Sequence, residues 1–274
     1  MTAPNGGPSA DAIPIFVGPG QINAIMPSNA PLGMVSMQVT FNAARSNPSP
    51  VRVVNSSFGA FAANGAGAGP GSMFNFVSAG VQPINSTLNP ATPGQVMTLY
   101  GTGLGPALGP DNQAPAPGDL PVNVEVVVGG LRATKLYSGR SPCCSGIDQI
   151  VFQVPDAAPQ GCWVPVYVRT ASTTTSNVVT MAIQSGGGPC VDQANPLAQR
   201  FVNGGKLGVF LGLRAAIRED IGVLRPIDVT SEFFGTAMSA ESGGQFAFNP
   251  LVSLPPAGTC TVYTAAGDLM GEVF

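Results

Sequence analysis

The chain contains no histidine, only two lysines and few charged residues of any kind. Charged side chains make up 9% of the 274 residues, far below the roughly 25% of an average soluble protein. The missing histidine excludes catalysis by a Ser-His-Asp triad or a Cys-His pair. The net charge of −3 offers no basic surface to nucleic acid or to an anionic membrane, so we expect neither as a partner.

The sequence also lacks long apolar runs and helical periodicity. The longest mostly apolar run, from Leu207 to Ile217, contains Arg214 and is too short to span a bilayer, so we predict no membrane span. Glycine (36) and proline (27) form nearly a quarter of the chain, and both disfavour helices. The 44% hydrophobic content is nevertheless ample for packed cores. The composition predicts an all-β protein of about two domains.

A segment near the start of the chain recurs later. Residues 21–33 and 149–161 share a Gln-Ile pair, a proline and an Ala-Pro-x-Gly turn at an offset of 128, which we expect to hold without gaps to about Val39. Ser46-Asn47 then matches Ser176-Asn177 at an offset of 130, which predicts a two-residue loop insertion. The later copy follows a long strand-like stretch that the first copy lacks. We therefore expect the first module to be a back half, either in a fragment of a longer chain or after a start assigned downstream of the true one.

Short strands with period-two alternation fill the later module. Val122, Val124, Val126 and Val128 face one way until Gly129-Gly130 closes a tight turn. About seven strands at this spacing predict a β-sandwich. The predicted domains are a back half-module at 1–55, a Gly/Ala-rich joint at 56–77, a complete module at 78–185 and a further, truncated β-rich domain at 186–274. Within the last, Leu207–Leu213 alternate as a strand, whereas 213–224 also fits a short helix.

Several motifs of the complete module resemble those of one known family. They are Pro93-Gly94 with Gly101-Thr102-Gly103-Leu104-Gly105, the Val-Val-Gly-Gly-x-x-Ala hairpin at 127–133, Val154-Pro155, Pro159-x-Gly161 and Ser176-Asn177. Together they resemble an IPT/TIG domain over roughly residues 13–190. The nearest likeness is to a secreted bacterial subgroup that carries Cys143-Cys144, Gly161-Cys162 and Gly-Gly-Pro-Cys190. The resemblance implies immunoglobulin-like β-sandwich modules in tandem, in an extracellular or cell-surface protein.

The resemblance indicates the fold and the setting but says little about activity, because this family is defined by its fold. We expect a non-catalytic, structural or adhesive module array, with no catalytic residue, cofactor or metal. Its partners would be neighbouring modules and a protein or polysaccharide at the cell surface. The alternative is a carbohydrate-binding accessory region of a secreted glycoside-active enzyme.

Four of the five cysteines lie in or just after the complete module: Cys143, Cys144, Cys162 and Cys190. In a secreted chain we expect two disulfides among them. Since a bond between adjacent cysteines strains the peptide that joins them, we expect Cys143 and Cys144 each to pair with one of Cys162 and Cys190. The zinc alternative lacks Cys-x-x-Cys spacing and histidine. Cys260 is left over, and its partner is expected outside this chain.

Two further groups of residues permit a functional interpretation beside a structural one. The run at 101–105 has the glycines of a nucleotide loop, but Pro106 replaces the sixth-position glycine, so a turn is expected. Paired carboxylates could hydrolyse glycosides, and Asp111, Asn112 and Asp119 could hold calcium. We expect solvated loop and strand residues instead. The carboxylate candidates are Asp111, Asp119, Glu125, Asp148 and Asp156.

The only tryptophan, Trp163, lies four residues before Tyr167 on the same predicted strand. Trp163, Tyr167 and Arg169 alternate with inward-facing valines, so they are predicted to form an outer ligand or partner face. The competing interpretation is that this face covers the sheet edge or packs on the next module.

Overall fold

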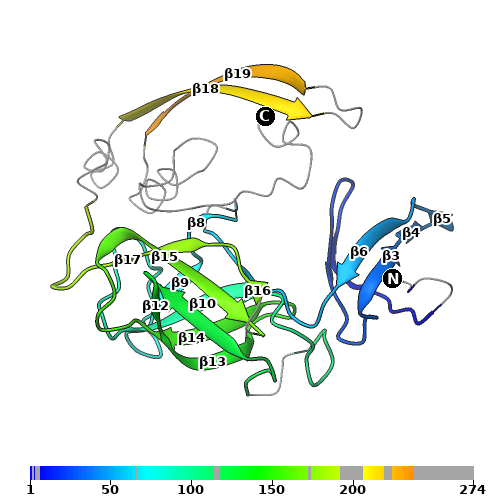
Figure 1. Ribbon diagram of the computed structural model, residues 1–274, viewed down its shortest axis with the longest axis horizontal. Coiled ribbons are helices and arrows are strands. Elements are labelled where there is room, and N and C mark those ends of the chain that lie inside the picture. Colours follow the sequence, from blue (N-terminus) through cyan, green and yellow to red (C-terminus); the bar gives the residue numbers. More distant parts are fainter. Residues whose placement is uncertain are drawn as a thin grey trace.

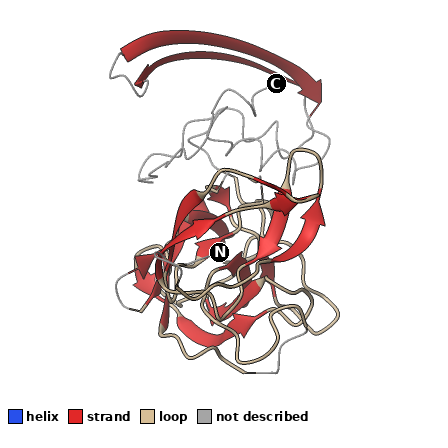
Figure 2. Ribbon diagram, turned by 90° about the vertical axis from the view of Figure 1, so that its right-hand side faces the viewer, coloured by secondary structure: helices blue, strands red, loops and turns tan. Residues whose placement is uncertain are grey.

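The computed structural model describes residues 1, 3, 7–63, 65, 67–113, 118–171 and 174–191, and the backbone of two strands at 206–218 and 224–236. Every regular element in these parts is a β-strand, as Figures 1 and 2 show, so the all-β prediction is confirmed. In the same parts of the chain, no helix is long and apolar enough to cross a membrane.

One sheet of the complete module has β10 at its centre. β10 pairs with β14 along one edge and with β7 and β9 along the other, and β13 extends the sheet beyond β14. All these pairs are antiparallel. The strands are β7 (Gly59–Ala60), β9 (Met73–Asn75), β10 (Val96–Thr102), β13 (Thr134–Arg140) and β14 (Asp148–Gln153).

The second sheet is built around β15, which pairs with β11 on one side and β17 on the other. The order is β12-β11-β15-β17-β8, with β16 on the end of β15, and only the β8–β17 pair is parallel. The strands are β8 (Gly69–Pro70), β11 (Val124–Val128), β12 (Leu131–Arg132), β15 (Gly161–Thr170), β16 (Thr174–Thr175) and β17 (Val179–Ile183).

The two sheets share one apolar core. Alternate residues of β15 are buried, as its sequence predicts, while β17 is buried along its whole length. Each fully buried aliphatic or aromatic side chain contributes about 1.5–3 kcal/mol relative to exposure, so this core holds the module together. The largest fully buried members are Phe152, Met73, Met97, Leu99, Leu104, Ile150, Met181, Ile183, Val126, Val128, Val154 and Val166.

The predicted joint at 56–77 is part of this module and not a linker, so that boundary was wrong. Phe58, Ala60 and Met73 lie in the core, while β7 and β9 pair with β10 in one sheet and β8 pairs with β17 in the other. The segment packs closely against β10. A Cβ at Gly101 would lie 2.3 Å from the Gly59 carbonyl oxygen, a distance that a side chain cannot tolerate.

Residues 13–53 form three two-stranded sheets, which Figure 1 shows in blue beside the module. β1 pairs with β2, β3 with β6, and β4 with β5, all antiparallel. We call these six strands the half-sandwich. They are β1 (Ile13–Val17), β2 (Ile22–Ile25), β3 (Gly33–Met37), β4 (Thr40–Phe41), β5 (Ala44–Arg45) and β6 (Ser49–Val53).

The pairing registers of the half-sandwich match those of the module. Pro14↔Ala24 and Phe16↔Asn23 flank a bulge in β1–β2, as Lys135↔Phe152 and Tyr137↔Val151 do in β13–β14. Val35↔Val51 in β3–β6 corresponds to Val164↔Met181 in β15–β17. β1 and β2 therefore correspond to β13 and β14, and β3 and β6 to β15 and β17.

Individual hydrogen bonds recur with these registers. The amide of Val39 donates to Ser46 Oγ at 3.0 Å, and the amide of Val168 donates to Ser176 Oγ at 2.9 Å. A register irregularity in β15 between Gly161 and Val164 adds one residue there. The offset thus rises from 128 to 129 inside the strand, and the gap-free alignment as far as Val39 was wrong at this point.

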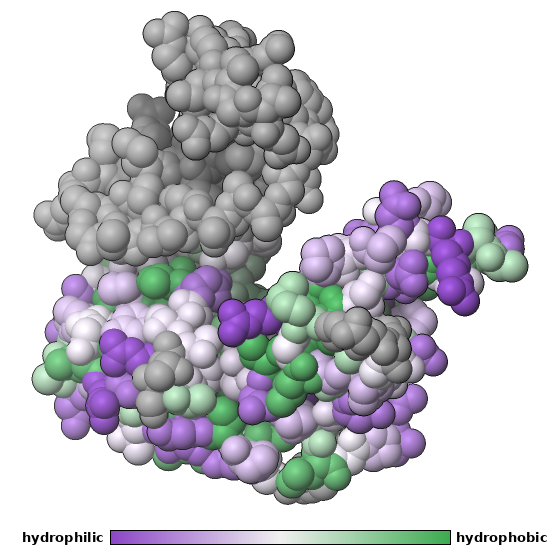
Figure 3. Space-filling model, turned by 45° about the vertical axis from the view of Figure 1, so that its right-hand side comes forward, coloured by the Kyte–Doolittle hydropathy of each residue, from purple (hydrophilic) through white to green (hydrophobic). Residues whose placement is uncertain are grey.

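Ser28 joins the half-sandwich to the loop after β10. Its amide donates to Asp111 Oδ2 at 2.8 Å and its hydroxyl to Asp111 Oδ1 at 2.5 Å, while the amide of Ala107 donates to Ser28 Oγ at 2.7 Å. Apolar patches lie between the projecting N-terminal strands and the body of the molecule (Figure 3).

The C-terminal part contains a hairpin of β18 (Lys206–Arg218) and β19 (Leu224–Thr236), paired in register along their whole length. The strand interpretation of Leu207–Leu213 is confirmed, and β18 continues to Arg218 where a helix had been the alternative. Residues 237–274, including Cys260, lie outside the described part of the chain, so the predicted domain at 186–274 stays a prediction.

Candidate functional site

The outer face of β15 carries a cluster of tyrosine, arginine and glutamate. Val166 and Val168 point into the core, so Tyr167 and Arg169 lie on the opposite face, each half-buried. The Arg169 guanidinium lies 5.3 Å from the centre of the Tyr167 ring, and Nη2 donates to the tyrosine hydroxyl at 3.2 Å. One face of this ring is therefore already covered by a cation.

Glu125 of β11 joins this cluster to a second arginine. Its Oε1 lies 2.9 Å from Arg132 Nε and 3.5 Å from Arg169 Nη1. Glu125 is directly opposite Arg169 in the β11–β15 register, which explains why the two side chains meet. The cluster borders a shallow depression lined by Asn123, Glu125, Arg132, Ala133 and Arg169.

Trp163 belongs to a different environment from Tyr167. The burial of alternate residues continues through this end of β15, where the pairing register with β17 shifts between Gly161 and Val164. The indole packs against Cys162, Ala182 and Cys190. The structure thus brings Tyr167 and Arg169 together but places Trp163 beside a disulfide, and a ligand or partner at any of the three stays a prediction.

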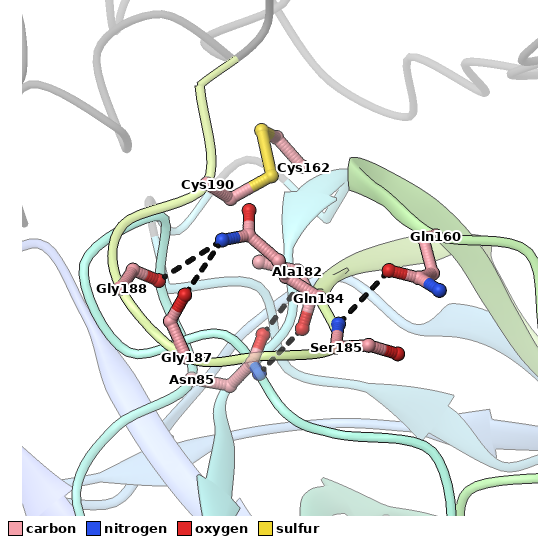
Figure 4. Close-up of a disulfide and its surroundings, with 9 residues drawn as sticks. All are labelled: Asn85, Gln160, Cys162, Ala182, Gln184, Ser185, Gly187, Gly188 and Cys190. Atoms are coloured by element: carbon pink, nitrogen blue, oxygen red, sulfur yellow. Dashed lines mark hydrogen bonds between the residues drawn. A yellow bond between two sulfur atoms is a disulfide. The ribbon is translucent and has the colours of Figure 1, made fainter.

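Cys162 and Cys190 form a disulfide with their Cα atoms 5.5 Å apart, in the range usual for such bonds. Figure 4 shows the bond above the chain that leaves β17. Asn85 fixes the strand below it: its Oδ1 accepts from the Ala182 amide at 2.8 Å and its Nδ2 donates to the Ala182 carbonyl at 3.0 Å. The disulfide and Asn85 together tie the end of β17 to the rest of the module.

The second cysteine pair is formed by adjacent residues. Cys143 and Cys144 are bonded to each other in the exposed β13–β14 loop, with Cα atoms 3.8 Å apart. The expected pairing of each with Cys162 or Cys190 was therefore wrong. The reason is topological: β13 and β14 carry the first pair in one sheet, whereas Cys162 belongs to β15 in the other.

Asp148, one of the carboxylate candidates, is fully buried. Its Oδ1 lies 2.5 Å from Arg140 Nη1, and its Oδ2 accepts from the Leu104 amide at 2.7 Å. Burial raises the pKa of this carboxyl, although the Leu104 amide and the Arg140 charge act in the opposite direction. All the contacts are internal, so Asp148 holds the 101–105 turn on the sheet.

Asp119 is held in a similar way. It accepts from Lys135 Nζ, and its Oδ1 accepts from the Ser138 amide at 2.8 Å. Burial alone would raise the pKa of Asp119, but the Lys135 side chain and the Ser138 amide outweigh it, so the pKa lies below its ordinary value.

The glycines at 101–105 serve close packing. Gly103 has a φ of +90°, and a Cβ there would lie 2.3 Å from the Ser57 carbonyl oxygen. Gly105 would meet the carbonyl oxygen of Asn55 at 3.0 Å. The segment 55–59 thus lies directly against the run at 101–105, which leaves no room for side chains at Gly103 and Gly105.

Sequence reasoning missed three residues of these networks, Ser28, Asn85 and Arg140. Ser28 and Asn85 meet partners 83 and 97 residues away, a separation that no local motif encodes. Arg140 lies eight residues from Asp148 and directly opposite it in the β13–β14 hairpin. A correct prediction of this strand pairing could therefore have indicated the contact between the two side chains.

In the described part of the chain, no three histidine, cysteine, aspartate or glutamate side chains gather as metal ligands would. Comparison of the chain with protein-family models, with curated proteins and with solved structures found no match.

Proposed function

We propose that the chain is a non-catalytic structural and adhesive array of immunoglobulin-like modules of the IPT/TIG type, in a secreted or cell-surface bacterial protein. The observation that carries this proposal is the recurrence of strand registers: β1–β2 repeats the bulged pairing of β13–β14, and β3–β6 repeats that of β15–β17. Two units built on one plan in one chain are typical of modular arrays, whose repetition supplies length.

Extracellular location is supported by the Cys162–Cys190 bond, because disulfides persist in oxidising compartments. A structural role is supported by the polar groups of the module. Asp148, Asp119 and Glu125 each contact a basic side chain of the same module. Side chains engaged in this way hold the sheets together and are poorly placed for proton transfer to a substrate.

The alternative, a carbohydrate-binding region, is less well supported. Sugar binding by stacking needs an accessible aromatic face, and the Arg169 guanidinium lies over the Tyr167 ring. Trp163 packs beside the Cys162–Cys190 bond.

Display of the full chain on a non-adhesive bacterium tests the proposal. Cells that carry the chain are expected to aggregate or to attach to protein-coated surfaces, whereas the purified chain shows no hydrolysis of polysaccharides. Saturable binding on a glycan array that is lost in Tyr167→Ala would favour the alternative, and turnover by the chain would exclude a non-catalytic role.

A further inference from the structure

The Cys143–Cys144 bond lies in the loop that joins β13 to β14, and both of its cysteines are exposed. The Cys162–Cys190 bond differs in both separation and exposure: it joins residues 28 positions apart, and these cysteines are 6% and 5% exposed. A thiolate in solution can therefore reach the first bond, whereas the second is shielded. Exposed and strained disulfides are the ones that exchange with thiols, while structural disulfides resist reduction.

The fold of the β13–β14 loop does not depend on the bond between its adjacent cysteines. Backbone hydrogen bonds close this loop, from the Ser141 amide to the Ile147 carbonyl at 2.8 Å and from the Ile147 amide to the Cys144 carbonyl at 3.3 Å. The equivalent hairpin, β1–β2, turns through residues 18–21 and contains no cysteine. The disulfide is therefore not needed to form the hairpin, which leaves it open to a chemical role.

A buried hydroxyl lies beside one of the two sulfur atoms. Ser141 is 0% exposed and its Oγ is 3.2 Å from Cys143 Sγ, while its other acceptor, Gln149 Oε1, is 3.5 Å away. Because a disulfide sulfur carries no proton, the hydroxyl is the donor to Cys143. This hydroxyl bonds more strongly to a thiolate than to a neutral sulfur, since hydrogen bonds to ionised groups are the stronger ones. Cys143 is therefore the better leaving group, and Cys144 is the sulfur that a thiol attacks.

The adjacency of the two cysteines also affects how readily an opened bond closes again. At an ordinary disulfide, the released thiol attacks the mixed disulfide and expels the ligand. Disulfides prefer Cα atoms about 4.4–6.8 Å apart, whereas those of Cys143 and Cys144 are 3.8 Å apart. Reclosure must therefore strain the intervening peptide again, and this strain favours the mixed disulfide.

We propose that the Cys143–Cys144 bond is a thiol-capture site, at which a cysteine thiol from outside the chain becomes attached covalently to Cys144. The incoming thiolate attacks Cys144 Sγ and forms the new sulfur–sulfur bond. The Cys143–Cys144 bond breaks, and its electron pair stays on Cys143 Sγ. The thiolate formed there accepts the Ser141 hydrogen bond and then the proton that the incoming thiol lost to solvent. One disulfide replaces another, so the step needs no oxidant or reductant. This inference goes beyond the adhesive role and does not depend on it.

The test uses the full chain with Cys260→Ser, which removes the fifth cysteine, and reduced glutathione at mildly alkaline pH without oxygen. Peptide mapping without reduction is expected to place one glutathione on Cys144 and, after alkylation, a free thiol on Cys143. The Cys162–Cys190 bond is the internal control and is expected to react at least about tenfold more slowly. An adduct on Cys143, the absence of any adduct on the pair, or equal reactivity of the two disulfides overturns the proposal.

Two serine variants of this chain test the direction of attack. Ser141→Ala is expected to slow adduct formation about threefold or more and to spread the adduct over both sulfur atoms, because the Cys143 thiolate loses its hydrogen bond. Ser145→Ala changes the serine on the other side of the pair and is expected to leave rate and placement unchanged. Urea unfolding of both variants checks their fold. Identical rates and placement in the two variants overturn the assignment of Cys143 as the leaving group.

A second form of the chain tests whether the captured thiol can belong to a protein. It carries Cys143→Ser, Cys144→Ser, Cys260→Ser and Leu108→Cys, and Leu108 is 85% exposed. A covalent dimer through Cys144 on a non-reducing gel assigns the site to protein thiols as well as small ones. A glutathione adduct without this dimer assigns it to small thiols, and the absence of both products overturns the proposal.

Discussion

The guanidinium of Arg140 lies 2.5 Å from the carboxylate of Asp148, a side chain with no exposed surface. The pair sits where β13 meets β14, and Arg140 Nη2 also donates to the Gly105 carbonyl at 2.9 Å. Because Asp148 also accepts from the Leu104 amide, the pair connects the sheet to the glycine-rich turn after β10.

Arg140→Met is expected to destabilise the module by about 3–5 kcal/mol, since it leaves a buried carboxylate without its counter-charge. Urea unfolding at neutral pH measures the change. Arg132→Met is the matched control, because Arg132 is exposed and its bond to Glu125 contributes less than about 1 kcal/mol. Equal unfolding midpoints for wild type and Arg140→Met would show that the pair does not hold the turn.

The destabilisation by Arg140→Met is expected to shrink as the pH falls. Burial raises the pKa of Asp148 in the folded state, so the folded chain holds this proton more tightly than the unfolded chain does. The contribution of the Asp148 carboxyl to stability is therefore greatest in acid. It declines as the pH rises from 3.8 through the higher pKa of Asp148 in the folded state. Without Arg140 the carboxyl is best tolerated in its protonated form. Unfolding free energies of both proteins across the acid range test this, and a constant difference contradicts it.

Asp119→Asn is expected to show the opposite dependence on pH. The pKa of Asp119 is lowered in the folded state, so its stabilisation is present above 3.8 and is lost as the pH falls through the lower folded-state value. The variant should be less stable than wild type near pH 7, by under about 1 kcal/mol because the carboxylate is partly exposed. The two proteins should converge in strong acid, as followed by thermal unfolding.

Gly103→Ala is expected to destabilise the module by about 3 kcal/mol or more, because it combines a left-handed backbone with a collision against the Ser57 carbonyl. Gly109→Ala serves as the control, since a Cβ there meets nothing within 4 Å, and its effect should stay within about 0.5 kcal/mol. Differential scanning calorimetry of both variants measures the contrast.

Replacing Cys162 and Cys190 by serine is expected to lower the unfolding free energy by about 3 kcal/mol, because this bond spans 28 residues. The double change Cys143→Ser with Cys144→Ser should have little effect on chain entropy, since adjacent residues close no loop. Peptide mapping without reduction identifies the pairs directly. A peptide that links Cys143 or Cys144 to Cys162 or Cys190 would contradict both assignments.

Much of the module could be predicted from local patterns in the sequence. The alternating valines predicted β11 and β15, and Gly129-Gly130 predicted the β11–β12 turn. Period-two burial and turn chemistry are properties of neighbouring residues, so a sequence displays them directly.

The lack of histidine excluded catalysis by a Ser-His-Asp triad or a Cys-His pair, and the Gln-Ile and Ser-Asn matches pointed to two segments built on one plan. Tertiary structure decided the rest. In the folded chain, strands of the expected joint at 56–77 contribute to each of the two sheets, and Cys143 bonds to Cys144. The buried Asp148 carboxylate forms an ion pair with Arg140. Among the described residues the tertiary structure also left apolar side chains such as Ile22 and Met37 exposed, because burial depends on strands brought together from distant parts of the chain, and no local pattern in the sequence records that pairing.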